Sequence, residues 1–144
     1  MASANFLNLT RALAKADVDF DTITCKVMLV SSIPSEANLD AWANRSDVTN
    51  EITGTGYTAG GIAQAFTLDA VDATNNRQSV TYTNQPAAWP SPTATFSAVG
   101  AIIYKNTGTA STDTLLHFID FVGTKTASAG SFALTYTAPF YINR

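Results

Sequence analysis

His117 is the first side chain to consider for chemistry, because it is the only histidine in the chain. A Ser or Cys nucleophile usually needs such a base, which is itself held in place by a third group. His117 lies in an apolar segment, on the same face as Leu115, Ile119 and Phe121, and the sequence places no such partner near it. We therefore expect an interior or interface histidine rather than a catalytic base.

Cys25 is the only cysteine, and it lies in the middle of an expected strand between Thr24 and Lys26. A reactive thiolate prefers a helix N-terminus or an electropositive pocket, so core packing is the favoured interpretation. A single cysteine cannot form an internal disulfide, which agrees with a reducing compartment.

Asp120 is the most unusual charge, because it lies in the most apolar segment of the chain. A buried carboxylate must be paired or hydrogen-bonded, and the candidates are Lys26, Lys105 or a position at an exposed edge. A catalytic carboxylate pair would need a second buried acid, and the sequence offers none. We therefore expect that the chain is not an enzyme.

Two short motifs resemble ligand sites without completing them. Asp17, Asp19 and Asp21 have the spacing that opens a calcium loop, but positions six and twelve are Thr22 and Met28 instead of Gly and Glu. The glycine-rich run GTGYTAGG at 54–61 lacks the spacing and the Lys-Ser or Lys-Thr pair of phosphate-binding loops. We expect a solvated acidic linker, a structural glycine loop, and no metal or cofactor.

Trp89, Tyr57 and Trp42 are aromatic residues in or near expected loops. Together they could form a platform on which a sugar ring stacks, which makes a carbohydrate-binding module one alternative. Isolated aromatic residues near loops are more often core plugs or interface anchors.

The composition excludes several classes of protein. The chain has 144 residues, 46% hydrophobic and only 13% charged, with 23 Ala and 21 Thr. This is the length of one domain, and the charged fraction is about half of the usual 25%. A net charge of −3 with eight scattered Lys and Arg gives no footprint for nucleic acid. The apolar runs are too short to span a membrane, and the start of the chain lacks a signal peptide, so we expect synthesis and retention in a cytoplasm.

Hydrophobic periodicity predicts two helices and about six strands. The first helix, capped by Ser3 or Asn5, would use Phe6, Leu9, Leu13 and Ala16 as its buried face, and Ser35 would cap a short second helix through about residue 44. Strands are expected at 23–30, 62–72, 78–84, 93–105, 115–122 and 131–137, with a short one at 140–143. Residues 85–92, which contain three prolines, and residues 124–130 are expected to be loops, and Gly100 marks a bulge or close packing.

These elements predict a mainly β, single-domain antiparallel β-sandwich or jelly-roll with a short N-terminal helix and one further short helix. No repeat or linker divides the chain. The single domain is expected to span 1–144, with a helical arm at 1–20 and the β-sandwich at 21–144.

Four segments, taken in order, resemble a group of small virion structural proteins of tailed bacteriophages (Caudoviricetes) that are often encoded near the major capsid protein. These segments are DTITCKVMLV at 21–30, the glycine run at 54–61, AIIYKNTG at 101–108, and LLHFIDF at 115–121. The resemblance covers nearly the whole chain and implies a non-enzymatic head-decoration or cement protein. It supplies no catalytic or cofactor-binding residue. The proline-rich stretch 86–92 is not part of the pattern.

The resemblance implies a protein that is made in the host cytoplasm and located on the capsid surface of the virion. Its expected partners are the major capsid protein and copies of itself, for instance as a trimer, with no nucleic acid and no membrane. Phe6, Leu9, Leu13, Tyr57 and Trp89 are the expected contact residues. A place in the tail, neck or fibre base of the same virion is the second alternative.

Overall fold

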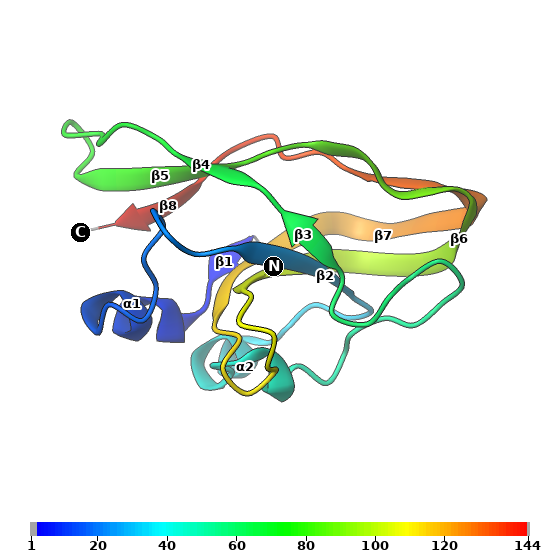
Figure 1. Cartoon of the computed structure of the whole chain (residues 1–144), viewed down its shortest axis with the longest axis horizontal. Coiled ribbons are helices and arrows are strands. Elements are labelled where there is room, and N and C mark those ends of the chain that lie inside the picture. The colour runs from blue at the N-terminus through cyan, green and yellow to red at the C-terminus, as the bar shows by residue number, and fades with distance from the viewer. Residues whose placement is uncertain (1–2, 144) are drawn as a thin grey trace.

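A computed structural model of the chain describes residues 3–143. Two antiparallel sheets pack face to face, and α2 lies on the opposite side of the larger sheet (Figure 1). The chain is thus a mainly β sandwich with two short α-helices, as the sequence predicts.

The larger sheet has five strands in the order β1-β7-β6-β2-β3. Their bounds are β1 (Ala4–Asn5), β2 (Cys25–Val30), β3 (Ile62–Gln64), β6 (Gln85–Lys105) and β7 (Leu115–Leu134). The smaller sheet has the order β4-β5-β8, with β4 (Phe66–Leu68), β5 (Arg77–Tyr82) and β8 (Phe140–Asn143). The helices are α1 (Leu7–Ala14) and α2 (Glu36–Ala41), and η1 (Arg45–Asp47) is a single 3-10 turn.

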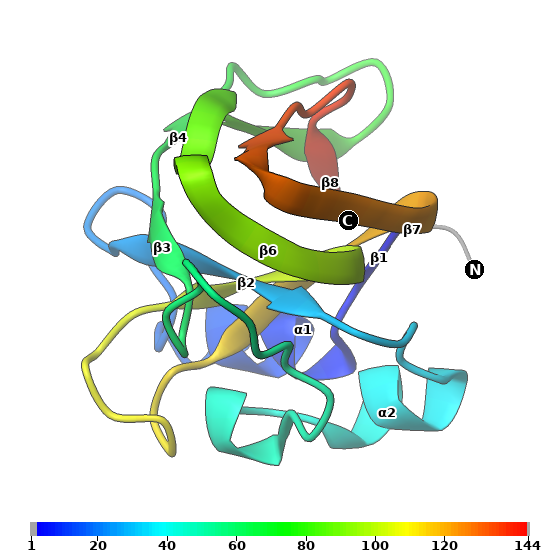
Figure 2. The same cartoon turned by 90° about the vertical axis from the view of Figure 1, so that its right-hand side faces the viewer.

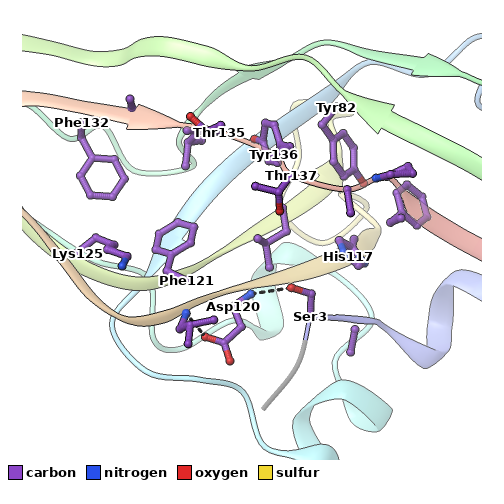
Figure 3. A pocket seen from close by; sticks show the side chains of 18 of the residues that line it. Ser3, Tyr82, His117, Asp120, Phe121, Lys125, Phe132, Thr135, Tyr136 and Thr137 are labelled. Atoms are coloured by element: carbon purple, nitrogen blue, oxygen red, sulfur yellow. Dashed lines mark hydrogen bonds between the residues drawn. The ribbon is translucent and has the colours of Figure 1, made fainter.

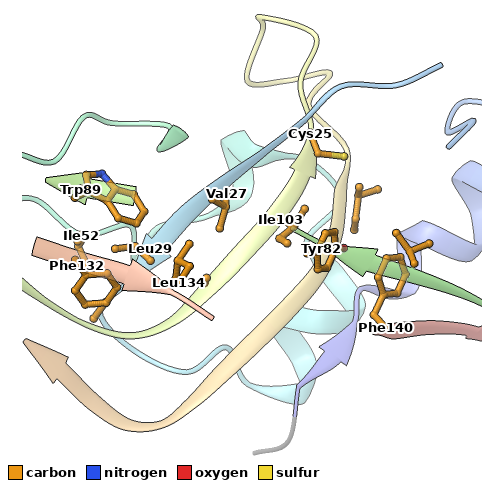
Figure 4. Packing of buried hydrophobic residues seen from close by; sticks show 14 of the residues in the cluster. Cys25, Val27, Leu29, Ile52, Tyr82, Trp89, Ile103, Phe132, Leu134 and Phe140 are labelled. Atoms are coloured by element: carbon orange, nitrogen blue, oxygen red, sulfur yellow. The ribbon is translucent and has the colours of Figure 1, made fainter. Parts of the chain in front are cut away.

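Strand β2 explains why the larger sheet is buried on both faces. Cys25, Val27 and Leu29 point into the main core between the two sheets, whose packing Figure 4 shows. Met28 and Val30 point to the other face, where they join a second core with Leu39 of α2. Alternate residues of a strand face opposite sides of a sheet, so an apolar run of this kind is what a two-sided burial requires.

The hairpin of β6 and β7 is the longest feature of the fold, and it bends around the core (Figure 2). It includes residues 85–92 and 124–130, so the prediction of loops in these two segments is wrong. The first part of β6 is paired with β7 only at Gln85, Trp89 and Ala94, with register shifts between them. Such interrupted pairing tolerates proline, which has no N–H to donate.

Strand β7 contains a bulge at residues 121–124. Ala98 pairs with Lys125 and Gly100 pairs with Asp120, so β7 has three more residues than β6 between these pairs. Val122 lies at the bulge with φ 53° and is 87% exposed. The close packing predicted at Gly100 is confirmed, because a Cβ there would lie 2.6 Å from the carbonyl oxygen of Ile119.

Helix α1 begins after Phe6, and no side chain caps it. Ser3 and Asn5, the predicted caps, are not available, because Ala4 and Asn5 pair with β7 as strand β1. The helix buries Leu9 and Ala12 in the main core, where Val18 and Phe20 also lie. Residues of the predicted N-terminal arm are therefore part of the sandwich core. Ala16 is exposed with φ 57°, so it does not continue the buried face.

Helix α2 follows its prediction closely. The Ser35 hydroxyl accepts a hydrogen bond from the backbone N–H of Asn38, whose side chain accepts one from the N–H of Ser35. This reciprocal capping box satisfies two backbone donors at the start of the helix. Leu39 is buried in the second core and Trp42 packs against it.

Candidate functional site

A cavity of about 800 Å³ lies between β7 and the segment that leads to β8 (Figure 3). One wall is formed by residues of β7 and the facing wall by residues 135–137, while aromatic side chains form the deeper end. The residues considered below are Asn5, Tyr82, His117, Asp120, Phe121, Lys125, Phe132, Thr135, Tyr136, Thr137 and Phe140. Sequence reasoning did not find this cavity, because its walls come from segments far apart in the chain.

His117 lies at the cavity with a defined tautomer. The Asn5 side-chain nitrogen donates to the carbonyl oxygen of Tyr141 at 2.9 Å, which fixes the orientation of the Asn5 amide. The Asn5 side-chain oxygen, 2.7 Å from His117 Nδ1, must then accept, so Nδ1 carries the hydrogen. Burial lowers the pKa of His117 to about 4. At neutral pH the imidazole is therefore uncharged, and its Nε2 is a hydrogen-bond acceptor.

Tyr82 and Phe140 form the aromatic end of the cavity together with His117. The rings of Tyr82 and Phe140 are stacked at 5.4 Å, and those of His117 and Phe140 at 5.0 Å. The Tyr82 hydroxyl is buried and has no hydrogen-bond partner within residues 3–143. Desolvation raises the pKa of this hydroxyl well above its ordinary value, so Tyr82 stays neutral.

Asp120 lies half-buried at the rim of the cavity, on the outer edge of β7. Its backbone N–H donates to the Ser3 hydroxyl at 3.1 Å, and its carboxylate accepts from the N–H of Val122 at 2.8 Å (Figure 3). Of the alternatives that the sequence left open, the position at a sheet edge fits this geometry. Two backbone donors of β7 are thus bonded to side chains.

The other predicted chemical residues do not join this cavity. Cys25 is buried in the main core, where desolvation raises the pKa of its thiol to about 12, so the predicted core role fits. Asp19 accepts a hydrogen bond from the backbone N–H of Asp21 and so closes a local turn. Residues 3–143 contain no group of three or more His, Cys, Asp or Glu that could hold a metal ion. Within the same range, no helix is long and apolar enough to cross a membrane.

The predicted contact residues are mostly inside the molecule. Phe6, Leu9 and Trp89 are 1%, 2% and 2% exposed, and Leu13 and Tyr57 are partly buried. Phe6 fills the second core, while the other four belong to or pack against the main core. The expectation of a contact surface is therefore corrected for Phe6, Leu9 and Trp89, since apolar residues of a helix and of a strand pack into the chain's own core first. For Leu13 and Tyr57, which are partly exposed, it stays a prediction.

The three aromatic residues of the possible sugar platform do not meet. The rings of Tyr57 and Trp89 lie 5.7 Å apart in the main core, whereas Trp42 packs against the second core. Because Trp89 is almost fully buried, no open stacking surface exists at this place.

The glycine run at 54–61 is a structural loop, as predicted, and a polar network holds it. The Tyr57 hydroxyl donates to Glu51 at 2.7 Å and accepts from the backbone N–H of Leu29 at 3.1 Å. The Tyr104 hydroxyl donates to the carbonyl oxygen of Gly60 at 2.6 Å. Gly61 has φ 67°, and a Cβ there would lie 1.8 Å from the carbonyl oxygen of Val27, so only glycine fits.

A second surface feature is the outer side of the β6–β7 hairpin, which we call the hydroxyl face. Alternate residues of β6 from 94 to 98 are buried, and those between them are exposed, as are their cross-strand neighbours on β7. Ser97 and Thr126 bond to each other at 2.7 Å. No charged residue occurs at 85–104 or 126–143. The hydroxyl face consists of Thr93, Thr95, Ser97, Thr126 and Ser128.

The neutral, hydroxyl-rich character of this surface follows from the composition, but its place does not. It becomes a continuous patch because residues 124–130 are a strand paired with β6 and not a loop. Comparison of the chain with protein-family models, with curated proteins and with solved structures gives no match. The function is therefore inferred from the residues and geometry of this chain.

Proposed function

We propose that the chain is a non-enzymatic structural protein of a tailed-phage virion, namely a decoration or cement protein on the outer surface of the head. Its partners are the major capsid protein and further copies of itself. It acts by binding: many copies bridge neighbouring capsid subunits and so raise the free energy needed to open the shell.

The hydroxyl face is the observation that carries this proposal. The centres of protein interfaces are depleted in charge, because burying an unpaired charge costs far more than burying a hydroxyl. Ser97 and Thr126 already satisfy one another, which lowers the cost of covering them further. A sheet face without charges suits the repeated contacts of a symmetric assembly.

The four sequence segments resemble segments of virion proteins, and this resemblance indicates that the proposed assembly is a phage particle. Nothing in a role of this kind requires a catalytic group, and a low charged fraction of 13% suits a subunit that is surrounded by neighbours. The same arguments hold for a place in the tail, neck or fibre base.

The proposal is tested with heads of the phage that encodes the chain, prepared without this protein. Purified wild-type protein should bind these heads and raise their melting temperature. Thr126→Glu should abolish binding, because it places a charge at the centre of the hydroxyl face, while its circular dichroism spectrum stays that of the wild type. The matched control is Thr74→Glu at an exposed position of the β4–β5 turn, which should bind normally.

Binding to neither heads nor tails would overturn a virion role. A particle image separates the two locations, since a decoration protein covers the head in many copies, whereas a neck protein forms one small ring. Density at the neck alone would replace the head assignment by the second.

A further inference from the structure

The cavity beside His117 has the size and chemistry of a small-ligand site. Its volume of about 800 Å³ is within the range of about 300–1,000 Å³ in which such ligands are held. It combines aromatic walls with a few polar groups, which is the usual composition of a binding pocket. Of the residues of the hydroxyl face, Thr126 alone lines this cavity, so the two features adjoin at that residue and are otherwise distinct.

The polar groups at the cavity favour an uncharged ligand with hydroxyl groups. Nδ1 of His117 donates its hydrogen to Asn5, so Nε2 is a hydrogen-bond acceptor. No described residue donates a hydrogen bond to this Nε2. The exposed hydroxyls of Thr135 and Thr137 can both donate and accept. Among residues 3–143, only Asp120 and Lys125 are charged residues that line the cavity, and their charges are opposite. Neither an anion nor a cation is favoured.

The aromatic groups favour a ring with an apolar face. Phe121 on β7 and Tyr136 on the facing segment are both half-buried and lie on opposite walls (Figure 3). Their backs are supported, since Phe121 packs on Phe132 at 6.1 Å and Tyr136 on Tyr82 at 5.4 Å. The Tyr136 hydroxyl donates to Gln64 at 2.6 Å, which holds the ring in place. Sugar rings present a C–H face to such aromatic groups and hydroxyls at their edges.

An added β-strand is a poor occupant of the same place. The backbone N–H groups of Asp120 and Val122 already donate to side-chain oxygens. The bulge at residues 121–124 interrupts the regular edge of β7, and β1 occupies the edge at Phe118 and His117. Bulged and locally capped edges resist strand addition.

We propose that this cavity binds a neutral saccharide, with one sugar ring between Phe121 and Tyr136 and a ring hydroxyl donating to Nε2 of His117. This activity would add to an assembly role and does not depend on it, because Thr126 is the one described residue that the cavity and the hydroxyl face share, and the groups assigned to the sugar lie outside that face. On a virion, it would let the subunit hold glycans of a cell surface.

The test uses the purified chain and a panel of five sugars: glucose, galactose, mannose, rhamnose and N-acetylglucosamine. Proton–nitrogen NMR spectra are recorded during each titration. We expect at least one sugar to give saturable shifts at the amides of residues 117–125 and 131–141, together with a shift of His117 Nε2. Absence of saturable shifts for all five sugars, or shifts elsewhere in the chain, would overturn the proposal.

Two variants and a control test the assigned groups. His117→Phe keeps a ring beside Phe140 but removes the acceptor, and should weaken binding about tenfold, the equivalent of one hydrogen bond. Phe121→Leu keeps apolar bulk without an aromatic face and should weaken binding by a similar factor. The control is Thr74→Glu, at an exposed position that does not line the cavity, so it should bind the same sugar with little change.

Each variant is checked for a wild-type amide spectrum outside the cavity before titration. Unchanged affinity in both His117→Phe and Phe121→Leu would contradict the assignment. Tighter binding of an extended peptide than of any sugar at the same amides would also contradict it, and would assign the cavity to a protein partner. Because no phage particle is involved, failure here leaves the proposed head-binding role unaffected.

Discussion

Tyr82 and Tyr104 show how differently one hydroxyl group can contribute at the scale of a single residue. Both side chains are buried, at 3% and 1% exposure, but only the Tyr104 hydroxyl has a partner, the carbonyl oxygen of Gly60. A buried polar group without a partner costs free energy, whereas a satisfied one contributes a net stabilisation of about 1 kcal/mol.

We therefore expect opposite results from the same substitution at these two positions. Tyr82→Phe should raise the free energy of unfolding by about 1 kcal/mol, and Tyr104→Phe should lower it by about the same amount. Urea denaturation of the two variants and the wild type measures both values. A loss of stability in Tyr82→Phe comparable to that in Tyr104→Phe would mean that the Tyr82 hydroxyl has a bonding partner after all.

His117 should make stability depend on pH in a window of its own. Its pKa is about 4 in the folded chain and 6.5 ordinarily, so the unfolded chain binds the proton first as the pH falls. Stability is therefore full above pH 6.5 and decreases towards pH 4, by about 1.4 kcal/mol for each pH unit at most. Urea midpoints at pH 5 to 7 measure this slope. His117→Gln should remove it, because no other side chain ordinarily titrates there.

Asp113 should make the stability of the fold depend on pH in a lower range than His117 does. Burial raises the pKa of this carboxyl, but hydrogen bonds from Arg45 at 2.8 Å and from the Thr107 backbone at 2.7 Å outweigh it and hold the pKa below its ordinary value. A lowered carboxyl pKa stabilises the fold above the ordinary value of 3.8 and loses this effect as the pH falls below it. In Asp113→Asn, the decline of the urea midpoint below pH 4 should be shallower than in the wild type.

At the scale of the element, glycines in two different loops, the run at 54–61 and the β6–β7 connection, offer a matched pair of substitutions. Gly61 and Gly108 both have positive φ, 67° and 87°, but a Cβ on Gly108 would meet no atom within 4 Å. Gly108→Ala should therefore cost only the backbone strain, about 1–2 kcal/mol. Gly61→Ala adds a clash with the backbone of β2 and should cost about 3 kcal/mol or more. Thermal unfolding of both variants measures the difference, and equal losses would mean that β2 yields to the added methyl group.

At the bulge of β7, we expect a substitution to raise the free energy of unfolding and not to lower it. Val122 is a β-branched residue at φ 53° and 87% exposed, so it has strain without the compensation of packing. Val122→Asn should raise the free energy of unfolding by about 1 kcal/mol, because Asn tolerates the left-handed region. Its measurement is a urea titration beside Val122→Ala, which retains the strain.

Regular elements could be predicted from the sequence, whereas their interruptions could not. Ser35 and Asn38 have the spacing of a capping box, which they form at the start of α2. The apolar run of β2 indicates a strand buried on both faces. Residues 85–92 and 124–130 contain Pro, Gly and Ser, whose local preference for turns is overridden by pairing between β6 and β7. Such pairing depends on two segments that are distant in the sequence, so the residues of either segment alone do not predict it.

The candidate site shares this property. His117 is recognisable as an unusual residue, but its role depends on Asn5, Tyr141 and Phe140, which are 112 residues before it and more than 20 after it. Most of the contact residues chosen from apolar spacing proved to be core residues, because apolar spacing reports the buried side of an element. An uncharged contact surface can be recognised only when it is known which residues are exposed, and apolar spacing does not provide this.

At the scale of the whole molecule, the absence of charge from the hydroxyl face has a consequence for binding. Contacts between neutral groups are little screened by ions, whereas contacts between charged groups weaken with salt. If the hydroxyl face is the contact, binding of the chain to phage heads should be similar at low and high salt concentration. Sedimentation of heads with labelled protein measures this, and a steep loss with salt would place the contact at charged residues elsewhere.

The pairing of β1 with β7, and the bond from Asn5 to Tyr141, also affect the order in which the chain folds during synthesis. Asn5 finds its partner 136 residues later, and no neighbour of β1 in its sheet comes early in the chain. During synthesis, β1 leaves the ribosome before β7 and therefore has no strand to pair with until β7 has emerged. Folding dominated by distant pairing is slow. The hydroxyl face is built from both β6 and β7, so a nascent chain that has not yet completed β7 does not present this face.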